Sequence, residues 1–361
     1  MKYQILENIC QKVSSNIKQS DLVNNNGDYP IYGASGFIKN VDFYTQDKPY
    51  IGIVKDGAGV GRVMKLPAFS SVIGTMQYII PNDDIDVSYL AYAMEHMNLS
   101  KYYMGAAIPH IYFKDYKNEK LPNHTKDEQA QIVHKLDLIC DLITKRNNQL
   151  SKLDELIKSR FVEMFGDFKT NPYNFEKKKL KDTCDVITGN TPSRAIAEYY
   201  GDYIEWIKTD NIVTGQIYPT QANEYLSFDG MNVGRFVDKD SILMSCIAGS
   251  LSSIGRVCIT DRKVAFNQQI NALSPKEYNV YFLYILLLLS KDYLVEEINM
   301  ALKGILSKSG LGNKEYILPP IELQNQFADF VTQVEKQKAT VQQSIDKLET
   351  LKKSLMQECF G

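Results

Sequence analysis

Hydrophobic residues recur at steps of three and four through two long segments, residues 132–160 and 327–355. Neither segment contains proline or glycine, and a repeat of about 3.5 residues is typical of coiled-coil helices. We predict two long helices that pair with each other, against the alternative of two unrelated surface helices. The apolar positions are Ile132, Leu136, Ile139, Ile143, Leu150, Leu153 and Ile157 in the first segment, and Phe327, Val331, Val334, Val341, Ile345, Leu348 and Leu355 in the second.

Basic residues interrupt both apolar seams, and the interruptions do not coincide. Arg146 and Arg160 interrupt the first seam, whereas Lys338 and Lys352 interrupt the second. If the two helices pair, each long basic side chain can lie with its stem along an apolar neighbour.

The two helical segments are copies of one another. Residues 129–166 align with residues 324–361 without a gap, which indicates that the chain contains two copies of one plan. Identical residues occur at Gln129, Gln131, Lys152, Leu153, Leu156, Lys158, Ser159, Glu163, Phe165 and Gly166, which fall on Gln324, Gln326, Lys347, Leu348, Leu351, Lys353, Ser354, Glu358, Phe360 and Gly361.

The segments that precede the two helices are predicted to be mixed α/β domains with the same order of elements. In the first we expect strands at 30–37, 50–55, 62–64 and 72–81, a glycine turn at 56–61, and a helix at 88–98 with Ser88 as its N-cap. In the second we expect an opening element at 180–187, strands at 241–246 and 266–273, a glycine loop at 248–250, and a helix at 281–289. Cys184 is placed like Cys10, and Gly255 like Gly61.

The chain therefore divides into a globular domain, a helix, a second globular domain and a second helix. We place these at residues 1–122, 123–166, 167–317 and 318–361. Gly166, Asn171 and Pro172 break the first helix at the joint between the halves.

Composition narrows the class of protein. The 361 residues carry a net charge of −2, which argues against nonspecific nucleic-acid binding but leaves room for basic loops. The six scattered cysteines form no zinc motif and fit a reducing, cytoplasmic location. The N-terminus does not resemble a signal peptide, and the longest apolar run, residues 280–289, is about half of a membrane span. We expect a cytoplasmic protein with no membrane contact and no metal site.

Two short motifs resemble catalytic ones, and we interpret both as turns. The glycines of residues 57–61 have the wrong spacing for a dinucleotide fingerprint, and a strand follows them. Asn171, Pro172 and Tyr173 resemble a methyltransferase motif that lacks its second proline. With no nucleophile elbow or phosphate loop either, we predict that the chain is not an enzyme.

Polar loops with basic and amide side chains remain, chiefly residues 189–194, 208–211 and 267–269, with Lys303 and Lys308 beyond them. Arginine and lysine suit guanine edges and phosphates, whereas asparagine and glutamine suit adenine edges. The alternative is ordinary surface loops whose amides stabilise turns.

Five stretches accompany the two-copy layout: residues 189–208, residues 267–272, residues 29–36, and the lead-ins to the helices at 121–129 and 318–324. With this layout they resemble a specificity subunit of a type I restriction–modification system, and the resemblance covers nearly the whole chain. The first lead-in departs from the family pattern, with Asn123 and His124 where a second proline is usual.

The resemblance implies an α+β fold in which two target-recognition domains are each followed by a long spacer helix. The helices would pair as an antiparallel coiled coil with pseudo-twofold symmetry. It further implies that the chain reads a split target on double-stranded DNA for two modification subunits. Those subunits bind S-adenosylmethionine, and restriction subunits that use ATP and magnesium join them. The chain itself would bind no cofactor.

Helix length is consistent with such a spacer. Residues 128–161 would span roughly 50 Å as a helix, which is about one to one-and-a-half turns of duplex. A competing hypothesis is a coiled-coil scaffold whose globular halves bind proteins. For DNA contacts we select Tyr32, Ser35, Lys55, Arg62, Gln77, His110 and Tyr112 in the first half, and Thr191, Ser193, Arg194, Lys208, Asp210, Asn211, Ser250, Arg256, Asn267, Gln268 and Lys303 in the second. Arg62 and Arg256 could equally bracket their glycine turns, and His110 could form only a local hydrogen bond.

Overall fold

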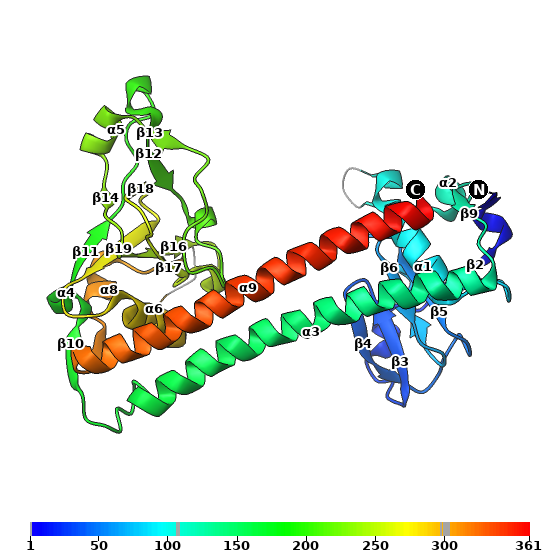
Figure 1. Ribbon diagram of the computed structural model, residues 1–361, viewed down its shortest axis with the longest axis horizontal. Coiled ribbons are helices and arrows are strands. Elements are labelled where there is room, and N and C mark those ends of the chain that lie inside the picture. Colours follow the sequence, from blue (N-terminus) through cyan, green and yellow to red (C-terminus); the bar gives the residue numbers. More distant parts are fainter. Residues whose placement is uncertain (1, 106–108, 297, 299–303) are drawn as a thin grey trace. The chain divides into compact units, whose positions relative to one another are not determined.

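The computed structural model describes residues 2–105, 109–296, 298 and 304–361 (Figure 1). The chain forms two compact units. Unit 1 comprises Met1–Asn148 with Gln342–Gly361, and unit 2 comprises Gln149–Val341. The long helices α3 (Lys126–Phe165) and α9 (Ile321–Phe360) each contribute one end to each unit.

Unit 1 is built on a four-stranded antiparallel sheet in the order β2-β8-β5-β6. Helix α1 (Val87–His96) packs beside it in an apolar core that includes Ile51, Ile79 and Leu90. A second sheet has the order β4-β3-β7, with β3 and β7 parallel. The strands are β2 (Cys10–Ser14), β3 (Tyr29–Gly33), β4 (Gly36–Val41), β5 (Tyr50–Val54), β6 (Val63–Leu66), β7 (Ser71–Val72) and β8 (Met76–Pro81).

Unit 2 repeats this arrangement with the sheet order β11-β19-β15-β17. Its second sheet is β13-β12-β18-β14, in which β12 and β18 are parallel. Helix α6 (Val280–Leu289) takes the place of α1 and is largely buried. The strands are β11 (Cys184–Thr188), β12 (Tyr200–Ile207), β13 (Tyr225–Leu226), β14 (Phe236–Val237), β15 (Ile242–Ser245), β17 (Val257–Ile259), β18 (Val264–Phe266) and β19 (Ile270–Pro275).

Short elements complete the units. Strands β1 (Tyr3–Ile5) and β9 (Lys120–Pro122) pair in unit 1, as β10 (Glu176–Lys179) and β21 (Glu315–Leu318) do in unit 2, where β16 (Ile247–Ala248) also pairs with β20 (Gly304–Ile305). The short α-helices are α2 (Phe113–Tyr116), α4 (Leu180–Thr183), α5 (Phe228–Val233), α7 (Lys291–Val295) and α8 (Lys308–Asn313). The 3-10 helices are η1 (Leu6–Asn8), η2 (Gln19–Leu22), η3 (Leu99–Tyr102), η4 (Ala197–Tyr199), η5 (Thr209–Asn211) and η6 (Leu251–Ser253).

The strand register confirms that the halves are copies. Cys10 begins β2 opposite Pro81, and Cys184 begins β11 opposite Pro275, as their sequence positions predicted. Gly61 and Gly255 both adopt positive φ angles, +85° and +75°, just before β6 and β17. At Gly61 a Cβ atom would lie 2.5 Å from the backbone nitrogen of Ser100, so glycine is also required for space.

Four local predictions need correction. The single strands expected at 72–81 and 266–273 are each two strands, because a turn at residues 73–76 and another at 267–270 carries the chain from one sheet to the other. The strand expected at 30–37 is the hairpin of β3 and β4. The N-cap of α1 is Asp86, not Ser88, because the Asp86 carboxylate accepts hydrogen bonds from the backbone N–H groups of Ser88 and Tyr89.

Contacts within each unit confirm that the long helices pair in antiparallel fashion. In unit 2, Phe161 and Phe165 near the end of α3 pack against Phe327 near the start of α9. In unit 1, Ile132 near the start of α3 shares a core with Phe360 at the end of α9.

Basic residues that interrupt the apolar seams reach side chains on neighbouring helices. Lys338 Nζ lies 2.7 Å from Asp154 on α3, and the Arg160 guanidinium lies 6.0 Å from the centre of the Phe330 ring on α9. In unit 1, Lys352 Nζ lies 2.8 Å from Glu95 on α1. Each cation of these pairs therefore has a partner outside its own helix.

Gln129 and Gln324 explain one of the sequence identities. Gln129 Oε1 accepts from the Asp86 backbone N–H at 2.9 Å, and its Nε2 donates to the His124 carbonyl at 3.0 Å. Gln324 forms the same pair of bonds with the Asn279 N–H at 2.9 Å and the Pro319 carbonyl at 2.8 Å. Asp86 and Asn279 are the N-caps of α1 and α6. Each buried amide thus attaches a spacer helix to the domain before it.

Candidate nucleic-acid interface

Three polar loops of unit 2 meet at the ends of strands. Residues 189–194 follow β11, residues 208–211 follow β12, and residues 267–269 join β18 to β19. Backbone hydrogen bonds hold the loops together: Asn267 N–H donates to the Ile207 carbonyl at 3.0 Å, and Asn190 N–H donates to the Phe266 carbonyl at 3.2 Å. The fold therefore brings together most of the residues selected in the second half.

Arg194 and Lys208 share one carboxylate in this cluster. Arg194 Nη2 lies 2.6 Å from Glu224 Oε2, and Lys208 Nζ donates to Glu224 Oε1. The guanidinium lies 4.3 Å from the centre of the Tyr200 ring and 5.2 Å from that of Trp206. The pKa of the Glu224 carboxyl lies below its usual value, because the hydrogen bond from Lys208 lowers it most and the hydrogen bond from Arg194 lowers it further. Glu224 is therefore an anion at neutral pH, between two cations on an aromatic surface.

Amide side chains shape the neighbouring turn. Asn267 is buried, and its Oδ1 accepts from the Gln269 backbone N–H at 3.1 Å. Thr191 and Gln268 are exposed and hydrogen-bonded to one another. In this turn, Asn267 holds the backbone while Thr191 and Gln268 present polar groups to solvent.

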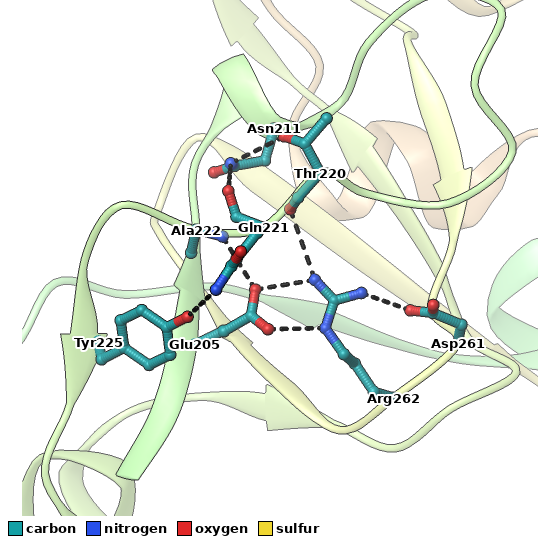
Figure 2. A network of polar contacts seen from close by, with 8 residues as sticks. All are labelled: Glu205, Asn211, Thr220, Gln221, Ala222, Tyr225, Asp261 and Arg262. Atoms are coloured by element: carbon teal, nitrogen blue, oxygen red, sulfur yellow. Dashed lines mark hydrogen bonds and ion pairs between the residues drawn. The ribbon is translucent and has the colours of Figure 1, made fainter. Parts of the chain in front are cut away.

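A network that sequence reasoning missed anchors the segment between β12 and β13, residues 208–224 (Figure 2). Arg262 donates to both carboxylate oxygens of Glu205 at 2.8 Å and contacts Asp261 at 2.5 Å. Glu205 also accepts from the Ala222 N–H at 2.9 Å. These bonds lower the pKa of Glu205, Arg262 contributing most.

Asn211 closes the start of the same segment. It is buried, and its Nδ2 donates to Thr220 Oγ1 at 3.1 Å and to the Gln221 carbonyl at 3.0 Å (Figure 2). Its Oδ1 accepts from the Lys208 backbone N–H at 3.0 Å. Asn211 therefore holds the segment in place, and its neighbour Asp210 is exposed. A charged residue at position 205, between the apolar residues Ile204 and Trp206, was the available signal, but the sequence does not show its partner.

The other residues selected in the second half are distributed differently. Ser250 and Arg256 belong to a separate loop, where the Arg256 Nε donates to the Ser253 carbonyl at 3.3 Å and the Ser250 hydroxyl bonds to those of Ser252 and Ser253. Ser193 is exposed beside Arg194. Lys303 lies outside the described residues.

In unit 1, two loops carry selected residues. Lys55 Nζ lies 3.1 Å from Asp56, whose backbone pairs with that of His110, and the His110 and Tyr112 ring centres are 4.8 Å apart. Arg62 Nη1 donates to the Ala34 carbonyl at 2.7 Å, which joins the glycine loop to the β3–β4 turn that contains Ser35. Tyr32 packs edge-to-face on Phe37 in that hairpin.

Gln77 lies in the interior of unit 1, away from solvent. It is 2 % exposed, and its amide donates to the Tyr116 hydroxyl. In unit 2 the corresponding residue is Asn271, since Gln77 lies opposite Ser14 as Asn271 lies opposite Thr188. Asn271 is also buried and accepts from Thr188 Oγ1 at 2.7 Å. Both amides satisfy polar groups inside their units.

In the part of the chain that the structure describes, no helix has both the length and the apolar character needed to cross a bilayer. Among the same residues, no three side chains of His, Cys, Asp or Glu are grouped so that they could hold a metal ion.

Comparison with known families gives a consistent result. The model of the type I restriction modification DNA specificity domain matches residues 2–152 and again residues 172–350. Each globular half, with most of its spacer helix, therefore corresponds to one such domain.

Curated relatives are type I restriction enzyme specificity subunits. The chain is 36% identical to the HindI subunit of Haemophilus influenzae over 117 residues, which is 32% of this chain and 24% of that protein. It is 23% identical to the MjaVIII subunit of Methanocaldococcus jannaschii over 350 residues, 90% of this chain and 81% of that protein. With the MjaIX subunit of the same organism it is 25% identical, over 70% of this chain and 63% of the relative.

Solved structures share the fold. The S subunit of a type I restriction–modification system from M. genitalium superposes with a TM-score of 0.62 at 14% identity, covering 100% of this chain and 96% of that one. A chain from a study of complex assembly in the type I system gives a TM-score of 0.56 at 15% identity, covering 99% and 97%.

Proposed function

This chain belongs to the family of type I restriction–modification DNA specificity domains, and we propose that it reads a two-part DNA sequence on behalf of separate methyltransferase subunits. Each unit would recognise one half of the target, and the helix pair would set the spacing between the halves. The observation that carries this proposal is the duplication of one sheet framework with a different set of polar loops on each copy.

The chemistry of the loops supports DNA as the ligand. Arg194, Lys208 and Gln268 in unit 2, with Lys55, Arg62 and Tyr112 in unit 1, offer cationic, amide and aromatic groups at exposed or half-buried positions. Such groups bind phosphates and base edges. The names of the three curated relatives reported above, which are specificity subunits, support the same interpretation.

The partners we propose are two methyltransferase subunits that carry S-adenosylmethionine, together with restriction subunits that use ATP and magnesium. In this proposal the chain contributes recognition and no catalytic group, binds no cofactor of its own and acts in the cytoplasm. One structural neighbour comes from work on complex assembly and conformational transition of the type I system, and this supports such an assembly.

Methylome sequencing of the host with and without the gene tests the proposal. We expect one split motif with a spacer of fixed length to lose adenine methylation when the gene is deleted. Inserting one heptad into each long helix should then change the spacer and leave both half-sites unchanged. An unaltered methylome after deletion would favour the scaffold hypothesis, and so would failure of the tagged chain to retain a methyltransferase.

A further inference from the structure

Glu224 holds two cations at once, and both belong to the proposed DNA interface. Its carboxylate bonds to Arg194 through Oε2 and to Lys208 through Oε1. The three side chains remain partly open to solvent, at 56% for Arg194, 35% for Lys208 and 36% for Glu224. A ligand can therefore reach the cluster without any rearrangement of the core.

We propose that Glu224 is a specificity-determining residue of this interface, because it orients Arg194 and neutralises part of the positive charge that any DNA backbone would attract. The inference rests on the proposed function and deepens it. The cluster carries a net charge of about +1 where the two cations alone would carry +2. Glu224 thus lowers the electrostatic binding free energy that the cluster obtains from backbone phosphates, which are present in DNA of any sequence.

The geometry leaves Arg194 ready for a base edge. One face of its guanidinium lies over the Tyr200 ring, and one of its five N–H donors is directed at Glu224. A guanidinium fixed on two sides has little freedom to follow an irregular phosphate backbone. Its remaining donors suit a planar edge with two acceptors, which in the major groove is guanine.

Breaking the Glu224 contacts is the step that separates specific from nonspecific binding. A phosphate that takes Arg194 or Lys208 for itself must displace the carboxylate and recovers only a similar ion pair. A guanine edge can accept from the free donors of Arg194 while Glu224 stays in place. The correct sequence therefore gains contacts that a random sequence obtains only at the expense of existing ones.

The test uses the full chain in complex with its methyltransferase subunits. The probes are one duplex with the motif that the complex methylates in the host, and one of equal composition in which the half-site read by unit 2 is scrambled. Affinity for each is measured from low to physiological salt for the wild type, Glu224→Gln and Glu277→Gln. Glu277 is the matched control, since its carboxylate contacts Lys178 at 2.8 Å and is 42% exposed in the same unit.

For Glu224→Gln we expect tighter binding to the scrambled duplex and a salt dependence steeper by about one phosphate contact. We also expect the affinity ratio between the two duplexes to fall by at least about fivefold. Glu277→Gln should leave that ratio unchanged. In the double variant Arg194→Ala/Glu224→Gln, the further loss of discrimination should be smaller than the loss that Glu224→Gln causes alone, because Glu224 can no longer orient Arg194 and only the charge of Lys208 is released.

Three outcomes would overturn the inference. Unchanged affinities of Glu224→Gln for both duplexes would show that the carboxylate does not affect binding or discrimination. Equal weakening toward both duplexes would assign Glu224 a purely structural role. A wild-type complex that binds both duplexes equally would refute the proposed function itself and this inference with it, whereas the first two outcomes leave the proposed function standing.

Discussion

The hairpins beside the two central sheets differ far more than the sheets themselves. In unit 1, β3 and β4 are joined by Ala34 and Ser35, whereas in unit 2 residues 208–224 separate β12 from β13. Both hairpins occupy the same place, since β3 pairs in parallel with β7 as β12 does with β18. The framework is therefore duplicated, and the segments proposed to read DNA have diverged on it.

Repeated residues lie where each long helix meets a domain. Gln129 and Gln324 attach the start of each helix to the domain that precedes it, and Phe165 and Phe360 pack its end against a helix of the other globular half. The buried identities Gln129/Gln324 and Phe165/Phe360 thus mark contacts that both copies make. The following predictions test that separation between shared framework and divergent readers, from the largest expected effect to the smallest.

Removing the aromatic ring at the end of either helix should have the largest effect. Phe165 contacts Phe161, Phe282 and Phe327 with ring centres 4.8–5.5 Å apart, and Phe360 lies 5.4 Å from Tyr89. We expect Phe165→Ala and Phe360→Ala each to lower the free energy of unfolding of its unit by about 3–5 kcal/mol. Amide hydrogen exchange should show faster exchange in α6 for the first variant and in α1 for the second.

The repeat supplies a matched control for this experiment. Leu156 and Leu351 are a second pair of equivalent positions, and they are 46% and 53% exposed. Their alanine variants should change stability by less than about 0.5 kcal/mol. If Phe165→Ala loosened α1 in place of α6, the assignment of helix ends to units would be wrong.

Substitution of Gln129 or Gln324 should lower the free energy of unfolding less than the phenylalanine substitutions do, and by the same amount for each glutamine. Gln129→Ala and Gln324→Ala each remove a buried amide and leave a backbone N–H and a carbonyl without their partner. We expect each substitution to cost about 2 kcal/mol. Urea unfolding followed in each unit measures the cost, and the exposed equivalents Gln131→Ala and Gln326→Ala serve as controls. Markedly unequal losses would show that the two attachments are not equivalent.

The Glu205–Arg262 pair tests the divergent half. Glu205→Gln should cost about 1–2 kcal/mol at pH 7, because a carboxylate that accepts three hydrogen bonds loses its charge. The Arg262 bonds lower the pKa of Glu205 in the folded state, so its contribution is complete at neutral pH and is lost as the pH falls below about 4.3.

The indole of Trp206 can report how the contribution of Glu205 to stability changes with pH. Trp206 is the only tryptophan of the chain and is buried next to Glu205. Urea unfolding followed by its fluorescence at pH 7 and at acid pH should show the difference between wild type and Glu205→Gln shrinking with acidity. Glu198→Gln removes the same charge from an exposed site and should have little effect at either pH. A difference that persists in acid would contradict the assigned role of the ion pair.

The sequence could predict the shared framework because its signals are local or repeated. The heptad pattern predicts the two long helices, and the identities at Gln129 and Phe165 with their equivalents indicate the duplication from the sequence alone. The turns within 72–81 and 266–273 were not predicted, although Gly74 and Thr75 in the first stretch and the polar residues 267–269 in the second were available signals, because only the pairing of the strands decides where the chain crosses from one sheet to the other.

The contacts within the proposed DNA interface could not be predicted in the same way. Glu205 meets Arg262, and Arg194 meets Glu224, across separations that carry no periodic signal. Choosing polar loop residues found Arg194 and Lys208 but not the carboxylate that joins them. Gln77 was also selected as a DNA contact, yet its side chain forms an interior hydrogen bond to Tyr116.

The smallest effect is expected where the two helix copies differ within the seam. Lys338 of α9 occupies the position that Ile143 has in α3, its side chain is 17% exposed, and its ammonium lies between Asp154 and Glu335. A double-mutant cycle with Lys338→Met and Asp154→Asn should give a coupling of about 0.5 kcal/mol, because Asp154 is 63% exposed and water screens the pair. The measurement is urea unfolding of unit 2 at low and high salt, and the coupling should shrink at high salt. Lys336→Met, at an exposed position on the same helix, is the control for loss of charge alone. A coupling above about 2 kcal/mol would mean that this ion pair, and not the apolar seam around it, sets the register of the two helices.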